Sequence, residues 1–145
     1  MKGDNIAHRL LVFASRVVRM SRGLQSDFAT RHVMRQLVRA ATGGGANYEE
    51  ARAAESRADF VHKTSVAAKE VRESLYWLKL VEQAGLQTSS ALDLIQEANE
   101  LVAILTSSVK TARRQAPLCT ETGDRRKQGN AWNREQKTGN GARRP

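Results

Sequence analysis

The helical period of this chain is clearest in residues 60–81, FVHKTSVAAKEVRESLYWLKLV. Apolar and small side chains recur there at alternating spacings of four and three residues, whereas a half-buried strand would alternate at every second residue. The recurring positions are Phe60, Thr64, Ala67, Val71, Ser74, Leu78 and Val81. This pattern predicts one long helix with a single buried stripe.

Three further segments carry a stripe of the same kind. Their positions are Ile6, Leu10, Phe13, Val17, Met20 and Leu24 in the first, Val33, Met34, Leu37, Val38 and Ala41 in the second, and Leu94, Ala98, Leu101, Leu105, Ser108 and Ala112 in the last. A period near 3.5 residues favours helices that pack side by side with a slight left-handed supercoil. We therefore predict an all-α, antiparallel up-and-down four-helix bundle over residues 1–115.

Local signals mark the ends of the predicted helices. Ser56 followed by Asp59, and Ser90 followed by Asp93, are typical of the residues that cap a helix N-terminus. Gly85 is placed to end the third helix in a left-handed backbone conformation. The short connection that follows predicts that the third and fourth helices are antiparallel neighbours.

Three consecutive glycines, Gly43–Gly45, interrupt the second helical segment. Each glycine costs about 1 kcal/mol relative to alanine inside a helix, so we expect this helix to break or fray there and to resume at Ala46. A phosphate-binding loop is the alternative interpretation. The stretch lacks the spacing and the Lys-Ser/Thr of such a loop, and no predicted strand precedes it.

The composition excludes several classes of protein. Aromatic residues make up 5% of the 145 residues, with 10 Gly and 2 Pro, which argues against a turn-rich β-sandwich. A single cysteine, Cys119, excludes an internal disulfide framework and a cysteine-based zinc site. No apolar run approaches the roughly 20 residues that a membrane span needs. We expect a cytoplasmic protein in a reducing compartment.

The titratable residues do not assemble into a recognisable catalytic or metal centre. Asp59 and His62 have the spacing of half a di-iron bundle site, but His8 and His32 have no acidic residue three positions earlier to supply the other half. A capping Asp59 and a surface His62 explain the pair more simply. We predict no catalytic residue, no metal and no cofactor, and hence a protein that is not an enzyme.

The positive charge is concentrated at the two ends of the chain. The net charge is +9. Residues 1–45 contain eight basic and two acidic residues, residues 46–115 nine and ten, and residues 116–145 seven and three. The last segment is polar and lacks periodicity, which predicts a flexible basic tail. A localised basic field attracts polyanions, chiefly nucleic acid or an acidic protein surface.

Arginines form two rows on the first two predicted helices. They are Arg9, Arg16, Arg19, Arg22, Arg31, Arg35 and Arg39. A guanidinium can donate two hydrogen bonds to one phosphate, so the rows predict a surface that binds the backbone of RNA or DNA. A solvated helix face is the simpler alternative. A second alternative is a protein-interaction scaffold that docks an acidic partner such as a polymerase subunit.

A second set of apolar residues lies beside the main stripes. Its members are Leu11, Val18, Val61, Leu75, Ile95, Val102 and Val109. A broad core face accounts for such positions in many bundles. The other interpretation is an interface between copies of the chain, because wide apolar faces exceed what one small bundle covers.

Five segments of the chain together match a known pattern, and they are residues 31–39, 45–51, 54–63, 67–78 and 97–101. The pairs Asn47-Tyr48 and Asp59-Phe60, with Tyr76-Trp77-Leu78, are the most specific parts. In these segments the chain resembles the bacterial "four helix bundle protein" family, which is related to proteins encoded in intervening sequences of 23S rRNA genes. The resemblance covers about residues 5–114.

The resemblance implies a short bundle that often assembles as a ring-shaped homopentamer with a basic surface. A more distant relative is the accessory protein of diversity-generating retroelements, which is also pentameric and basic and binds a reverse transcriptase and nucleic acid. The resemblance therefore raises nucleic acid and a reverse transcriptase as partners, and it supplies no catalytic residues. Gly43 and Gly44 depart from the polar-then-aliphatic pair usual in the family.

Overall fold

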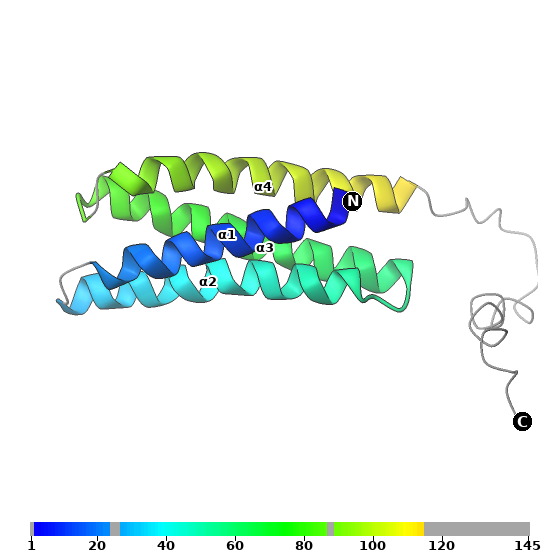
Figure 1. The fold of residues 1–145 in the computed structure, drawn as a ribbon, viewed down its shortest axis with the longest axis horizontal. Coiled ribbons are helices and arrows are strands. Elements are labelled where there is room, and N and C mark those ends of the chain that lie inside the picture. The colour runs from blue at the N-terminus through cyan, green and yellow to red at the C-terminus, as the bar shows by residue number, and fades with distance from the viewer. Residues whose placement is uncertain (1, 24–26, 87–88, 115–145) are drawn as a thin grey trace, which may run out of the picture.

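The computed structural model describes residues 2–23, 27–86 and 89–114. They form four helices, α1 Lys2–Arg22, α2 Phe28–Arg52, α3 Arg57–Gln83 and α4 Ser89–Arg114. The helices run up, down, up and down along one axis (Figure 1). Each helix packs against two others, so that α1 contacts α2 and α4 while α3 contacts α2 and α4. The predicted antiparallel four-helix bundle is confirmed, and the predicted tail lies outside the described residues.

The core is built from the predicted stripes. Leu10, Phe13 and Val17 of α1 are completely buried, as are Val71 and Leu78 of α3. Burying a large apolar side chain contributes about 1.5–3 kcal/mol, so these rows of side chains are the main source of the stability of the bundle. Ile6 and Val38 are only partly buried and pack against the edge of the core.

The helix ends agree with most of the local signals. The Ser56 hydroxyl accepts a hydrogen bond from the Asp59 N–H at 3.1 Å and caps α3, as predicted. Gly85 has φ +64° and ends the turn after α3, where the Leu86 N–H donates to the Val81 carbonyl at 3.0 Å. Helix α4 already begins at Ser89, so Ser90 lies inside the helix and not at its cap.

The predicted break at Gly43–Gly45 is wrong, because α2 runs without interruption through these residues. Gly44 is buried, and a Cβ atom added to it would lie 2.8 Å from the Cγ2 of Val71. The glycine thus allows α2 to approach α3 closely, and tertiary packing offsets its low helix propensity. The Asn47 side-chain amide also donates to the Gly43 carbonyl at 2.9 Å, within the same helix.

Candidate nucleic-acid interface

The structure divides the seven predicted arginines into two groups. Arg9 belongs to the first, because its Nε lies 2.8 Å from Oε1 of Glu97 and its Nη2 lies 2.7 Å from Oε2 of Glu100. Its Nη2 also donates to Oε2 of Glu97 at 2.9 Å, which makes the pair bidentate. The hydrogen bonds to Glu97 and then to Glu100 raise the pKa of Arg9 above its ordinary value. This guanidinium joins α1 to α4.

Arg39 is bound in the same way between α2 and α3. Its Nη2 donates to Oε1 of Glu73, and its Nη1 lies 3.8 Å from Oε2 of Glu70. The same Glu73 oxygen accepts a hydrogen bond from the Trp77 indole N–H at 3.2 Å. The Trp77 hydrogen bond and then Arg39 lower the pKa of Glu73. Arg39 is therefore already paired with protein carboxylates.

Arg16 is the third of the seven predicted arginines with an acidic partner, since its Nη2 lies 3.6 Å from Oδ2 of Asp93 on α4. Three of the seven predicted arginines, Arg9, Arg16 and Arg39, therefore have acidic partners. These acids lie outside residues 1–45, on α3 and α4, which the fold brings alongside α1 and α2. A cross-helix ion pair leaves little periodic signal in the sequence.

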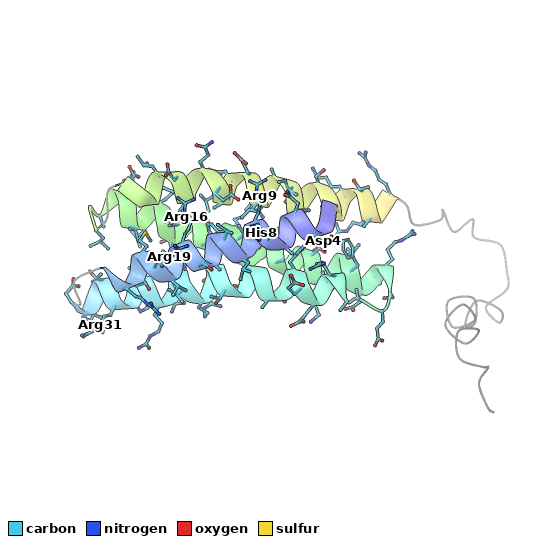
Figure 2. The ribbon with its side chains drawn as sticks, in the orientation of Figure 1. Asp4, His8, Arg9, Arg16, Arg19 and Arg31 are labelled. Carbon is cyan, nitrogen blue, oxygen red and sulfur yellow. The ribbon has the colours of Figure 1, made fainter. Side chains whose placement is uncertain are left out.

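The second group consists of Arg19, Arg22, Arg31 and Arg35, all of which are exposed. They lie at the end of α1 and the start of α2, which the antiparallel arrangement brings to one end of the bundle. We call these four residues the basic end. Figure 2 places Arg16, Arg19 and Arg31 toward this end and Arg9 between α1 and α4. Among the described residues, Arg19, Arg22 and Arg35 form no ion pair.

Asp27 precedes α2 and stands beside the basic end. Its carboxylate caps the helix by accepting from the Thr30 N–H at 3.0 Å and from the Thr30 hydroxyl at 2.6 Å. These two hydrogen bonds, with that of the hydroxyl first, lower the pKa of Asp27. The Asp27-x-x-Thr30 spacing is a capping signal that the sequence analysis missed.

Phe28, the first residue of α2, is another feature that the sequence analysis missed. Its side chain is 80% exposed and lines a shallow cleft of about 250 Å³ with Arg31, His32 and Arg35. Phe28 belongs to no apolar stripe, so periodicity could not identify it. The only available signal was a large apolar residue next to a cap and among arginines.

The predicted interface residues occupy different environments in one chain. Val109 is buried in the core, and Leu75, Ile95 and Val102 are partly buried against it, while Val18 and Val61 are also partly buried. Leu11 is 65% exposed and Val12 beside it is 40% exposed. Leu11 also lines an open groove of about 550 Å³ between α1 and α2. Of the seven predicted interface residues, Leu11 is thus the one whose surface is exposed in a single chain.

Within residues 2–23, 27–86 and 89–114, no group of three His, Cys, Asp or Glu side chains is arranged to hold a metal ion. His62 is exposed, and Asp59 contributes its backbone N–H to the α3 cap. None of the described helices has the length and apolar character required to cross a membrane. Cys119 lies outside the described residues.

A family model and a solved structure both relate this chain to one protein family. A family model described as 23S rRNA-intervening sequence protein matches residues 5–107. The chain is also similar to a protein from Bacteroides thetaiotaomicron whose crystal structure is described as that of a protein with unknown function from the S23 ribosomal protein family. The two sequences are 32% identical, and the two structures superpose with a TM-score of 0.70. The match covers 76% of this chain and 99% of that chain. A search of curated proteins gives no match.

Proposed function

Since the chain belongs to the 23S rRNA-intervening sequence protein family, we propose that it is a non-enzymatic, oligomeric bundle that binds the phosphate backbone of nucleic acid. The single observation that supports this function is the basic end. It gathers four exposed arginines on two adjacent helices, and Arg19, Arg22 and Arg35 form no ion pair among the described residues. Guanidinium groups that are not already paired can bind phosphate without first giving up a protein carboxylate.

The division of the arginines into two groups reduces the number of residues expected to bind phosphate. Arg9, Arg16 and Arg39 form ion pairs with acids on α3 and α4. Binding a phosphate there would break these ion pairs. The proposed site therefore centres on Arg19, Arg22 and Arg35, which form no ion pair among the described residues, and it includes the neighbouring exposed Arg31.

The experiment that tests this function is binding to RNA and DNA oligonucleotides across a salt series. Each phosphate contact contributes about 0.7 to the slope of log K against log salt for single strands. Replacing Arg19, Arg22 and Arg35 with Gln removes three contacts and lowers the slope by about 2, a loss of about 50-fold at 0.15 M salt. The matched control replaces Lys110, Arg113 and Arg114, three exposed cations near the end of α4, with Gln.

The two triple variants have the same net charge, so a general loss of electrostatic attraction would affect both equally. A loss confined to the variant of Arg19, Arg22 and Arg35 supports the proposed site. Equal affinities for these two variants and the unaltered protein would contradict it. Circular dichroism of each variant checks that the helices are intact.

Self-association is the second part of the proposal. The exposed Leu11 and Val12 lie on α1, and Leu11 lines the apolar groove between α1 and α2, which a second copy of the chain would cover. The family resemblance favours a homopentamer. Light scattering on the full chain tests this, and Leu11→Glu is expected to reduce the molar mass toward that of one chain. An unchanged mass would place the interface elsewhere.

A protein-interaction scaffold is the second candidate function, because the basic end also suits an acidic surface such as that of a reverse transcriptase. The salt series separates the two candidates. Backbone binding predicts affinity for any RNA or DNA of sufficient length and a steep salt dependence. Absence of binding at physiological salt would favour the scaffold.

A further inference from the structure

Exposed aromatic rings lie on the α2–α3 surface next to the basic end. Phe28 is 80% exposed and Tyr76 is 61% exposed. A single exposed aromatic residue is ordinary in a globular protein. Here Tyr76 contacts Trp77, Trp77 contacts His32, and His32 lines the same cleft as Phe28.

Three of the rings contact one another across the two helices, and Phe28 lies beside the first of them. Phe28 and His32 line the same shallow cleft at the start of α2. The His32 ring meets the Trp77 ring edge to face, with centroids 6.2 Å apart and planes at 77°. Trp77 meets Tyr76 in the same manner at 5.0 Å and 75°. We call Phe28, His32, Trp77 and Tyr76 the aromatic row.

Hydrogen bonds hold the centre of the row in place. The Trp77 indole N–H donates to Glu73 at 3.2 Å, and Arg39 donates to the same carboxylate oxygen. Arg39 thereby compensates the negative charge of Glu73 beside the row. A surface that is already ordered loses little side-chain entropy when a ligand binds.

Cations border the row on both helices. Arg35 lines the Phe28 cleft, while Arg72 and Lys79 lie on α3 four residues before and three residues after Tyr76. All three are exposed, and none forms an ion pair among the described residues. Aromatic platforms flanked by cations are typical of surfaces that bind single strands, in which bases stack on rings and phosphates contact the charges.

We propose that the aromatic row binds the unpaired bases of a single-stranded nucleic acid, with Phe28 and Tyr76 as stacking platforms. This inference rests on the proposed function and specifies its ligand. The bases of a duplex are stacked on one another and cannot reach the rings. A duplex would therefore use only the phosphate contacts of the basic end, whereas a single strand would use both surfaces.

Fluorescence anisotropy with the full chain tests this ligand class at fixed salt. The probes are a 20-nucleotide oligo-U RNA, a 20-nucleotide oligo-dT DNA, an abasic DNA strand of the same charge and a 20-base-pair DNA duplex. We expect both base-containing strands to bind more tightly than the abasic strand. Phe28→Ala and Tyr76→Ala should each weaken binding of these two strands by about 5- to 150-fold.

The same variants should leave affinity for the abasic strand and the duplex unchanged, and also the salt slope, because neither removes a charge. Phe28→Trp retains a platform and should bind as the unaltered protein does. Leu92→Ala is the matched control, since Leu92 is 57% exposed but lies on α4, which does not pack against α2. Circular dichroism and thermal unfolding confirm that each variant is folded.

Two results would overturn the inference, and they are distinguishable. If the abasic strand binds as tightly as oligo-U and the two alanine variants bind all probes normally, the row does not stack bases, while the phosphate-binding function stands. If no probe binds even at low salt, the proposed function fails and this inference fails with it.

Discussion

Gly44 and Gly45 are adjacent in α2 but meet different surroundings, which gives a sharp prediction about stability. A Cβ added at Gly44 would lie 2.8 Å from Val71 Cγ2, and Val71 is fully buried. A Cβ added at Gly45 would have its nearest contact at 3.9 Å, with the Cβ of Leu10. The first distance requires the core to move, whereas the second is an ordinary contact.

The expected free energies follow from these distances. Replacing glycine with alanine within a helix is favourable by about 1 kcal/mol. Overpacking a well-filled core costs about 1–3 kcal/mol. Gly45→Ala should therefore stabilise the protein by up to about 1 kcal/mol, while Gly44→Ala should destabilise it by up to about 2 kcal/mol. The two variants contain the same added methyl group, so their difference isolates packing.

Urea unfolding followed by circular dichroism measures both variants. The slope of free energy against urea should be unchanged, since neither substitution alters the surface exposed on unfolding appreciably. Measurements at two protein concentrations separate folding from subunit association. Equal stabilities for the two variants would refute the conclusion that close approach to α3 is the reason for Gly44.

Three further predictions concern contacts between and within the helices. Arg9→Met removes a bidentate pair with Glu97 and should lower the free energy of unfolding by about 1 kcal/mol, measured by urea unfolding. Ser56→Ala removes the α3 cap and should also cost about 1 kcal/mol, seen as a lower thermal midpoint. Because the pKa of Glu73 is lowered on folding, its stabilising effect is complete above pH 4.5 and is lost as the pH falls through the lower folded value. The Trp77 indole N–H resonance should shift in that acidic range, and Glu73→Gln should abolish the shift; a resonance that titrates identically in the variant would contradict the assignment.

The arginines of α1 and α2 differ in whether they form ion pairs with acids on the other helices. Arg9, Arg16 and Arg39 are engaged by acids from α3 and α4. Within the basic end, Arg19, Arg22 and Arg35 are exposed and form no ion pair among the described residues. The proposed nucleic-acid site and the structural ion pairs use different arginines, so mutation can test them separately.

Local and periodic features of the chain were sufficient to predict the bundle. The apolar period placed Leu10, Phe13, Val71 and Leu78 in the core, because the side-chain direction along a helix repeats with its turn. Helix ends such as the Ser56 cap depend on atoms within a few residues of one another. Interactions of this range are readable without knowledge of the tertiary structure.

Contacts between helices determine the continuity of α2 and the pairing of the arginines, which the sequence pattern did not predict. Gly44 has the propensity of a helix breaker, and only its approach to Val71 explains an unbroken α2. The arginines of the candidate site were identifiable, but whether each is paired depends on acids far away in sequence, as with Arg9 and Glu97, which are 88 positions apart. The contact between His32 and the Trp77 ring on α3 arises in the same way. Packing distance and charge pairing across helices are properties of three-dimensional proximity, and the periodic pattern of one helix does not encode which side chains its neighbour presents.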